Sequence, residues 1–549
     1  AQDPVLRRLL THRTPPACHH QRRALRTMAR LNVAVLVTSL ATLAQRATSD
    51  LPVHCLRHQV EGEWNFVLGE ASSKRSSCGH AHPDTEDAQP SRDVMRNGTS
   101  RLIELRSPNL VRTKEGQRGT WTMVYDEGFE VKVGDHTFFA FSNFTFQRDA
   151  VTHEKKNFSH CGDTMVGWFH NLDRTEFGCY FATKVQPEAP VPLPASKSAA
   201  SRSAQDKTMT HTAMTQKVAR LNARLNMLQL GWKAGVVRKW IGKTVREING
   251  YAGIRRLAPA RELHRDMMLQ ATAGRRHSRP SFLQRSRPAA LPSSWDWSNA
   301  TDGTDWLEPV MDQSDCGSCY AASTMRMLST RHKIRQNNAS VLPWSINMPL
   351  FCGEYNQGCK GGYPFLMSKW SSDVGLVPAT CMRYDTAGTC KLECDLDKLE
   401  GKRYRADNYR YVGSFYGNAS TEAIMEELYH NGPMVVSFEP AEDFMYYSDG
   451  VYKSEGLHNQ TEKPEWEKVD HAVLLVGYGE DNGTPYWRIQ NSWGPDWGED
   501  GFFRMLRGKD ESGIESIAVA ADVVEDPHNG RHVKDFFDSL EQKNKKKTA

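Results

Sequence analysis

The sequence has little net charge for its length. Its 70 lysines and arginines nearly balance 65 aspartates and glutamates, which leaves a formal charge of +5 over 549 residues. Proteins that bind nucleic acid through a wide basic surface normally carry a larger excess of positive charge. We therefore expect no nucleic-acid partner, and we interpret the local basic stretch at 255–287 as an accessible, cleavable segment and the lysines at 543–547 as a solvated tail.

The N-terminal region lacks an apolar run long enough to cross a membrane comfortably. Residues 31–41 are mostly apolar, but a membrane-spanning helix needs about 20 such residues. Three features predict a secretory signal peptide: Met28 as the start, Arg30 before the apolar run, and the small residues Ala47 and Ser49 at cleavage spacing. Residues 1–49 are therefore predicted to be leader and signal peptide, Asp50 is the expected new amino terminus, and no membrane span is expected.

The most specific motif is Cys-Gly-Ser-Cys-Tyr at residues 316–320. It places Cys319 at the start of a stretch, 320–328, that is predicted to be helical. A thiol attacks a carbonyl only as the thiolate, and the positive end of a helix lowers the thiol pKa. The motif therefore predicts Cys319 as a catalytic nucleophile.

Two downstream residues complete this pattern. His471 lies 152 residues after Cys319 at the head of an apolar run, and Asn491 follows 20 residues later in Asn-Ser-Trp-Gly. A histidine beside the sulfur can take the thiol proton and return it to the leaving amine, while the asparagine oxygen fixes the ring. Each residue alone has an ordinary structural explanation, but together in this order they predict a catalytic set.

Two more residues fit the same chemistry. Gln313, six residues before Cys319, can offer its amide N–H, alongside the backbone N–H of Cys319, to an oxyanion. Trp493 is placed to cover the hydrogen bond between His471 and Asn491 from water.

The chain divides into segments of different pattern. Residues 50–186 alternate polar and apolar, as at 120–125 and 137–141, which predicts an antiparallel all-β module. A linker rich in proline, alanine and serine is expected at 187–210, and helical periodicity from about residue 215 through 248 predicts a removable propeptide over 211–290. A peptidase domain is expected over 291–524 and a basic tail over 525–549. The string Gly477-Tyr478-Gly479 is interpreted as a turn rather than a nucleotide site, because Asn482 takes the third glycine position.

Cysteine use and sequons agree with an oxidising compartment. Setting aside Cys18 and Cys319 leaves ten cysteines, an even number that is typical of five disulfides. The alternative is a zinc site from some of His54, Cys55, His58, Cys78, His80 and His82. Eight glycosylation sequons support the secretory route: Asn97, Asn143, Asn157, Asn299, Asn338, Asn418, Asn459 and Asn482.

Residues 291–524 resemble the papain family of cysteine proteases. The resemblance lies in the motif around Cys319 and in the strings at 291–297, 358–362 and 486–494. From Asp50 onward the chain resembles one branch, dipeptidyl peptidase I or cathepsin C, on Tyr320, the strings at 471–479 and 514–518, and an additional N-terminal domain. The resemblance implies an α+β fold: a two-lobed papain-like protease domain, with Cys319 in a helical half and His471 in a β-rich half, preceded by an antiparallel β-barrel-like exclusion domain and a helical propeptide.

The resemblance also implies how the substrate is held. An exclusion domain closes the groove beyond the second substrate residue, the carboxylate of Asp50 binds the substrate ammonium, and Gly361, Gly362 and Trp493 lie along the groove. The implied disulfides are Cys55–Cys161, Cys78–Cys179, Cys316–Cys359, Cys352–Cys390 and Cys381–Cys394.

No cofactor is required by the resemblance. Relatives bind chloride through the tyrosine of Gly-Gly-Phe-Pro-Tyr, but this chain has Gly-Gly-Tyr-Pro-Phe, so that Phe365 replaces the tyrosine and chloride dependence is in doubt. The resemblance further implies an activating protease, a homotetramer after processing, and a lysosomal or secreted location.

The sequence thus predicts a cysteine exopeptidase that removes dipeptides from the free N-termini of polypeptides through an acyl-enzyme. Two alternatives stay open: a papain-like endopeptidase with an accessory N-terminal domain, and a non-catalytic secretory binding protein.

Overall fold

The computed structural model describes residues 55–80, 91–95, 97–148, 155–186, 191–192, 208–251, 291–454 and 471–548. We name three parts by their residues: the β-domain (55–192), the connecting segment (208–251) and the two-lobed domain (291–525). Asp50 and the predicted signal peptide lie outside the described residues. Among the residues that are described, no helix is long and apolar enough to cross a membrane.

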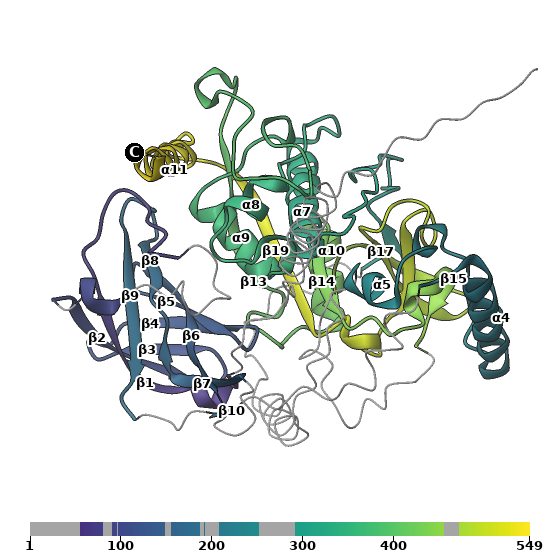
Figure 1. Ribbon diagram of the computed structural model, residues 1–549, viewed down its shortest axis with the longest axis horizontal. Helices are drawn as coiled ribbons and strands as arrows, with labels where there is room; N and C mark the ends of the chain where they lie inside the picture. The colour runs from purple at the N-terminus through teal and green to yellow at the C-terminus, as the bar shows by residue number, and fades with distance from the viewer. Residues whose placement is uncertain are drawn as a thin grey trace, which may run out of the picture. The chain divides into compact units, whose positions relative to one another are not determined.

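The β-domain is a closed antiparallel barrel. Its strands follow the order β1-β2-β3-β4-β5-β6-β8-β9, and β9 pairs back with β1, which leaves no open edge in the ring (Figure 1). Aromatic side chains fill the interior: Phe66 stacks on Tyr180 at a centroid distance of 5.2 Å, and Phe138 meets Phe66 edge-on at 5.4 Å. The predicted all-β module is thus confirmed.

The elements of this domain have the following bounds: α2 Arg57–Val60, β1 Gly62–Leu68, η2 Arg92–Met95, β2 Thr99–Arg106, β3 Leu110–Thr113, β4 Arg118–Val124, β5 Gly128–Val133, β6 His136–Arg148, β7 Lys155–Thr164, β8 Gly167–Asn171, β9 Phe177–Lys184 and β10 Val191–Pro192.

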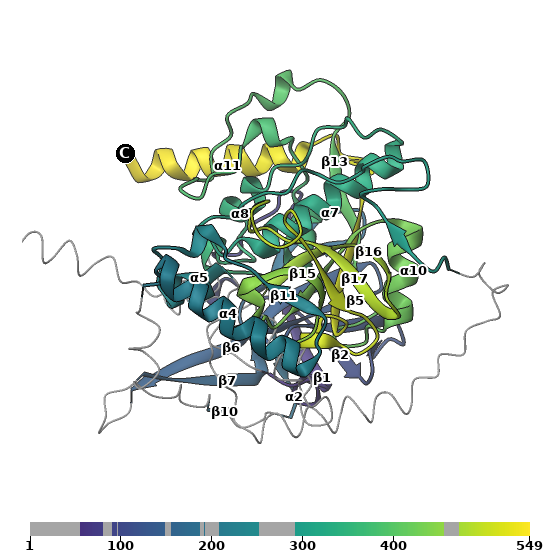
Figure 2. The same ribbon diagram turned by 90° about the vertical axis from the view of Figure 1, so that its right-hand side faces the viewer.

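The connecting segment begins as the predicted amphipathic helix. Helix α4 (His211–Leu228) is capped by the Thr210 side chain, which accepts from the Ala213 N–H, and it buries one stripe of apolar residues. The sequence pattern extended the helix through 248, but the structure ends it at 228. Gly231 has a φ of +79°, and Trp232 then pairs with Gly450, so that β11 (Trp232–Ala234) joins the sheet at β15 (Tyr447–Tyr452). The segment ends in η4 (Arg238–Trp240) and α5 (Val245–Tyr251), and Figure 1 and Figure 2 show α4 and α5 as separate helices.

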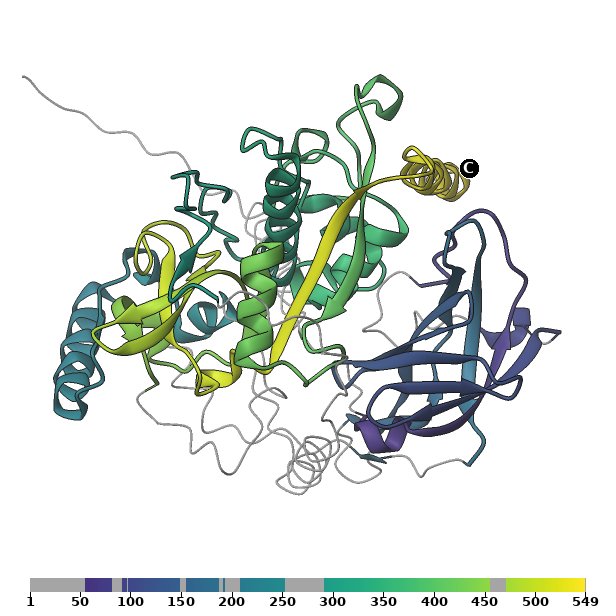
Figure 3. The same cartoon turned by 180° about the vertical axis from the view of Figure 1, so that it is seen from behind.

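The two-lobed domain has a helical half and a β-rich half, as predicted. Helix α7 (Cys319–Gln336) runs through the helical half and is buried on all sides over most of its length, while α8 (Asn347–Cys352) and α9 (Pro364–Asp373) pack around it. The β-rich half is a sheet in the order β11-β15-β18-β17-β16-β14-β19-β13, with β12 paired to β16. Figure 3 shows the long strand β19 (Ile517–Glu525) beside α10 (Thr421–Asn431).

The remaining elements have these bounds: β12 Trp295–Asp296, η5 Gly358–Lys360, η6 Ala379–Cys381, η7 Leu396–Lys398, β13 Tyr404–Tyr411, β14 Met434–Phe438, η8 Phe444–Tyr446, β16 His471–Asp481, β17 Thr484–Gln490, β18 Phe502–Leu506, η10 Glu511–Gly513 and α11 Arg531–Thr548. Helix α11 falls where the sequence predicted only a solvated tail, and its first turn is buried at His532 and Val533.

The cysteines pair as the resemblance implied. Five disulfides join Cys55–Cys161, Cys78–Cys179, Cys316–Cys359, Cys352–Cys390 and Cys381–Cys394, and Cys319 takes part in none of them. The alternative of a zinc site is wrong, because two of its proposed ligands, Cys55 and Cys78, are oxidised. Within the described ranges no group of three or more metal-binding side chains comes together.

Arg331 joins helix α7 to the β-rich half. Its guanidinium donates to the carbonyls of Gly432 and Pro433 and forms ion pairs with Glu427 at 2.8 Å and Asp522 at 3.0 Å. The Arg331 side chain is 3% exposed, so these charges are largely removed from water. The helix that begins at Cys319 is therefore fixed to the sheet by a buried charge network.

We predict that Arg331→Leu lowers the free energy of unfolding by about 3 to 5 kcal/mol. The reason is that the largely buried carboxylates of Glu427 and Asp522 lose the positive charge of Arg331. Arg335→Leu is the matched control, since Arg335 lies on the exposed side of the same helix and should cost less than about 1 kcal/mol. Urea unfolding followed by tryptophan fluorescence measures both variants. Equal losses in the two variants would contradict the role of the network.

Candidate active site

Cys319 is the first residue of helix α7. Ser318 before it has non-helical dihedrals, and its carbonyl accepts the first backbone hydrogen bond, from Ala322 N. Cys319 is 8% exposed and therefore sits at the positive end of a buried helix. The helix dipole favours the thiolate, because it acts most strongly within the first turn, whereas burial opposes the charge.

His471 and Asn491 are brought together by neighbouring antiparallel strands. His471 begins β16, and Asn491 directly follows β17, which pairs with β16. The Nε2–H of His471 donates to Asn491 Oδ1 at 2.8 Å, and the Trp493 ring stacks on the imidazole at 4.8 Å. The predicted hydrogen bond and its aromatic cover are both present. Because Nε2 is committed to Asn491, Nδ1 is the ring atom that can accept a proton.

The environment of His471 opposes a positive charge. Burial lowers its pKa to about 4, and the hydrogen bond with Asn491 raises the pKa by less than burial lowers it. The sequence analysis expected an imidazolium at this position. An imidazolium can form here only together with a nearby anion that offsets the desolvation, so the thiolate and the imidazolium must appear as a coupled pair.

Gln313 is hydrogen-bonded to Ser492, the residue that follows Asn491. Its backbone N–H donates to the Ser492 carbonyl at 2.8 Å, and the Ser492 hydroxyl donates to Gln313 Oε1 at 2.5 Å. The Ser492 N–H in turn donates to Asn491 Oδ1 at 2.9 Å. Ser492 thus fixes which end of the Gln313 amide carries the N–H groups. Ser492 lies in the motif Asn-Ser-Trp-Gly, and no role was predicted for it from the sequence.

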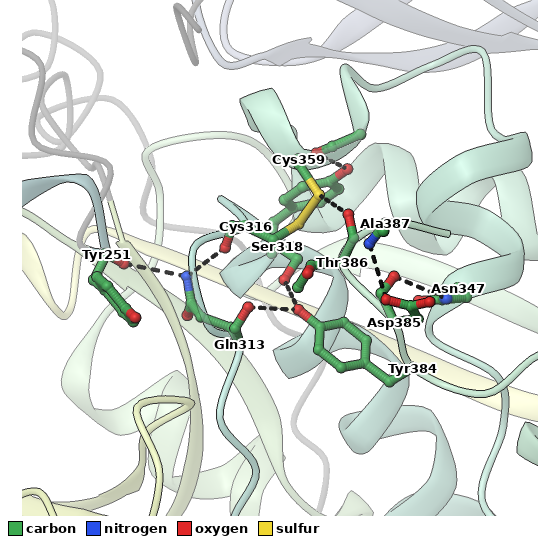
Figure 4. Close-up of a disulfide and its surroundings, with 12 residues drawn as sticks. Tyr251, Gln313, Cys316, Ser318, Asn347, Cys359, Tyr384, Asp385, Thr386 and Ala387 are labelled. Carbon is green, nitrogen blue, oxygen red and sulfur yellow. Dashed lines mark hydrogen bonds between the residues drawn. A yellow bond between two sulfur atoms is a disulfide. The ribbon is translucent and has the colours of Figure 1, made fainter. Parts of the chain in front are cut away.

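The Gln313 amide N–H is directed at a residue of the connecting segment. Figure 4 shows Gln313 between the carbonyls of Cys316 and Tyr251, to which its Nε2 donates at 3.0 Å and 3.2 Å. The indole N–H of Trp493 also donates to the Tyr251 carbonyl, at 3.3 Å. The last residue of α5 therefore occupies one of the two donors predicted for an oxyanion, the Gln313 amide.

Two lysines hold the connecting segment in this position. Lys239 donates to Asp312 at 2.9 Å and to the Trp493 carbonyl at 2.7 Å, while Lys243 pairs with Asp315 at 2.9 Å. The hydrogen bond from Lys243 lowers the pKa of Asp315, so the stabilisation from this pair is present above the ordinary pKa of aspartate and is lost only as the pH falls through a still lower value. Acid of about pH 5 therefore leaves this pair intact.

A turn of the β-domain reaches the same region. Tyr125 lies between β4 and β5 with a φ of +51°, and its ring is 4.6 Å from that of Tyr363 in the two-lobed domain. Burial raises the pKa of the Tyr125 hydroxyl well above its ordinary value. Tyr125 thus packs the β-domain turn on Tyr363, the residue that follows Gly362.

The tyrosine that replaced the family phenylalanine meets a carboxylate. The Tyr363 hydroxyl donates to Glu127 of the same β-domain turn, and Glu127 is 1% exposed. Phe365, at the family tyrosine position, stacks on Tyr411 at 4.6 Å and has no hydroxyl to donate. The Tyr363 hydroxyl is thus engaged by a side chain of the β-domain.

Gly361 and Gly362, which were predicted to line the groove, lie against helix α7. A Cβ at Gly362 would lie 2.6 Å from the Tyr320 ring and 2.5 Å from Asn356 Oδ1, and Gly361 has a φ of +128°. The Tyr320 hydroxyl donates to the Gly358 carbonyl at 3.1 Å, which fixes this loop beside Cys319. Side chains at either position would displace the loop.

Comparison with known proteins agrees with this geometry. Residues 291–522 match the model of the papain family cysteine proteases, and residues 50–184 match that of the cathepsin C exclusion domain. A protein named cathepsin C from Schistosoma mansoni is 30% identical over 495 residues, which cover 87% of this chain and 96% of that protein. The chain belongs to the cathepsin C branch of the papain family.

Other relatives extend the comparison. Dipeptidyl aminopeptidase 1 of Plasmodium falciparum is 24% identical over 668 residues, covering 88% of this chain and 95% of that protein. The solved structure of a digestive procathepsin L2 proteinase from Tenebrio molitor is 25% identical with a TM-score of 0.45, covering 60% of this chain and 95% of that one. The chain is thus a papain-family cysteine peptidase with an exclusion domain. The match to the exclusion-domain model covers the β-domain barrel.

We predict that the connecting segment shields Cys319 in the full-length peptidase. The double variant Lys239→Ala and Lys243→Ala should raise the rate at which iodoacetamide alkylates Cys319 by about tenfold, because it removes two partly buried charged contacts worth roughly 1.4 kcal/mol together. Mass spectrometry of the Cys319 peptide at pH 5 and pH 7 measures the rate.

Lys233→Ala is the control for this experiment. Lys233 lies in the same segment, but its exposed pair is with Asp449 of β15 rather than with the loop that carries Gln313. Its alkylation rate should equal that of the unmodified chain. A rate that rises equally in the control and in the double variant would show that the two ion pairs do not hold the segment over the thiol.

Proposed function

We propose that this peptidase removes dipeptides from the free N-termini of polypeptides through an acyl-enzyme on Cys319. One observation carries the proposal: a turn of the exclusion domain packs on the residue that follows Gly362, since the Tyr125 ring lies 4.6 Å from that of Tyr363 and Glu127 accepts the Tyr363 hydroxyl. A groove closed at that point admits only a short N-terminal stretch of substrate. The names of the Schistosoma and Plasmodium relatives support the same activity.

The chemistry begins with transfer of the thiol proton to His471 Nδ1. The thiolate then attacks the substrate carbonyl carbon, which forms a C–S bond and places a negative charge on the oxygen. The amide N–H of Gln313 and the backbone N–H of Cys319 stabilise this oxyanion, and His471 returns its proton to the departing amine. Water, deprotonated by His471, then cleaves the thioester and releases the dipeptide. Asn491 holds the imidazole in position throughout.

We propose that the connecting segment belongs to a propeptide that keeps the enzyme inactive. The Tyr251 carbonyl accepts from Gln313 and Trp493, and a substrate oxyanion would need the first of these donors. Because the Lys243–Asp315 pair persists at about pH 5, acid alone does not release the segment. An activating protease is therefore part of the proposal, as are a lysosomal or secreted location and a homotetramer of the processed enzyme.

The substrate ammonium is assigned to Asp50. Cys55, five residues later, donates its N–H to the carbonyl of Asp126 at 2.6 Å, so the start of the exclusion domain is anchored at the turn that carries Tyr125. Five residues span at most about 18 Å, which limits how far Asp50 can lie from this turn and supports the assignment. A carboxylate there pairs with a free ammonium, whereas a blocked, neutral amine leaves the carboxylate unpaired.

The decisive test compares a free-amino dipeptidyl aminocoumarin amide with its N-acetylated form, using protein from which the propeptide has been cleaved. The free form should be hydrolysed at least about a hundredfold faster, because an unpaired buried charge costs about 3 to 5 kcal/mol. Asp50→Ala should reduce that preference, and Cys319→Ser should abolish turnover. Gln313→Ala should lower kcat by about a hundredfold or more. Hydrolysis of both substrates at equal rates would instead identify an endopeptidase, and hydrolysis of neither a binding protein.

We further predict that the activity does not depend on chloride. The Tyr363 hydroxyl is committed to Glu127, so the ion has no donor there to bind. Hydrolysis rates in acetate buffer with and without sodium chloride, matched in ionic strength with sodium acetate, should agree within error. A rate that rises with chloride in a saturable way would contradict this assignment.

A further inference from the structure

Both family matches end before residue 526, yet the chain continues into helix α11, which Figure 2 shows as one continuous helix up to the C-terminal label. The helix has one apolar face with the spacing i, i+1, i+4, i+5 and i+8. Its first two members are buried and the others half-buried: His532, Val533, Phe536, Phe537 and Leu540. An amphipathic helix of this kind packs its apolar face on a neighbour.

One neighbour is the peptidase domain. The Cγ2 of Val533 lies 2.7 Å from the position that a Cβ would take at Gly375, so the helix approaches this backbone closely. Phe536 meets the Trp370 ring of α9 edge-on at 5.5 Å. The turn before the helix is fixed by a hydrogen bond from Asp526 N to the Arg403 carbonyl at 2.8 Å. These contacts anchor α11 to the helical lobe.

The other neighbour is the exclusion domain. His528 donates its Nε2–H to the carbonyl of Asp173 at 2.7 Å, and the His532 ring lies perpendicular to Phe177 at 5.2 Å. Asp173 and Phe177 lie in and just after the turn between β8 and β9 of the barrel. A weaker ion pair joins Lys74 and Asp535 at 3.7 Å. The same stretch of chain therefore contacts two domains at once.

We propose that residues 526–540 form a clasp that fixes the exclusion domain on the peptidase domain, and that His528 and His532 are positioning residues for dipeptide selection. This inference rests on the proposed function, since selection depends on the exclusion domain keeping its place beside Cys319. Neither histidine contacts the nucleophile in the structure, so their effect is transmitted through the barrel to the turn at Tyr125. A small displacement there is enough to admit substrates that the closed groove excludes.

The test uses the double variant His528→Leu and His532→Leu in the processed enzyme. The preference for the free-amino over the acetylated dipeptidyl substrate should fall about tenfold, because the variant loses one hydrogen bond and one aromatic contact. Amide hydrogen exchange in residues 167–184 should accelerate in the same variant. His528→Gln, which keeps a donor near the Nε2 position, should retain most of the preference, whereas His528→Leu should not.

Lys534→Ala is the matched control, because Lys534 lies on the same helix but pairs with Asp397 inside the peptidase domain. It should change neither the preference nor the exchange. If amide hydrogen exchange at 167–184 is unaltered in the double variant, the clasp is contradicted. This holds whichever substrate the wild-type enzyme prefers. Faster exchange with an unaltered preference would overturn the role in selection, and a wild type without any preference would instead overturn the proposed function.

Discussion

The active site depends on the hydrogen bonds between Gln313 and Ser492. Gln313 belongs to the loop that leads into the nucleophile helix, and Ser492 follows Asn491 in the β-rich half. The pair joins the two halves at the place where the chemistry needs residues from both. It also orients the Gln313 amide, since the oxygen accepts from Ser492 and the N–H groups must face the other way. Without this pair, the positions of the Gln313 amide and of Asn491 relative to each other would not be fixed.

In the proposed function, the same donor serves both activity and inhibition. The Tyr251 carbonyl accepts the N–H of Gln313 that the proposed mechanism gives to the substrate oxyanion. Because Lys243 lowers the pKa of Asp315, this pair keeps its charges at mildly acidic pH and does not act as an acid switch. In the proposed function, control of the site therefore comes from cutting or displacing the segment rather than from protonation of this pair.

The sequence predicted the local structure correctly where the motif residues are contiguous in the chain. Cys319 at a helix start and Asn491 in its turn were predicted because each motif specifies a local backbone shape. The disulfides followed from resemblance, because spacing alone leaves many pairings open. The helix over 211–228 was predicted from its periodicity, but the strand after it was not, since Trp232 pairs with Gly450, more than 200 residues away. The helical tail was missed because its apolar face is sparse and its end is rich in lysine.

The sequence by itself determined which atoms could react, which cysteines were available for disulfides, and which family the chain resembles. Only the tertiary structure decided what faces those atoms: Tyr251 at the oxyanion donors, Tyr125 and Glu127 of the exclusion domain beside the groove, and His528 against the barrel. The physical reason is that reactivity depends on the kind of side chain, which the sequence states directly. Burial, hydrogen-bond partners and access depend on contacts between residues far apart in the chain, which exist only once the chain has folded.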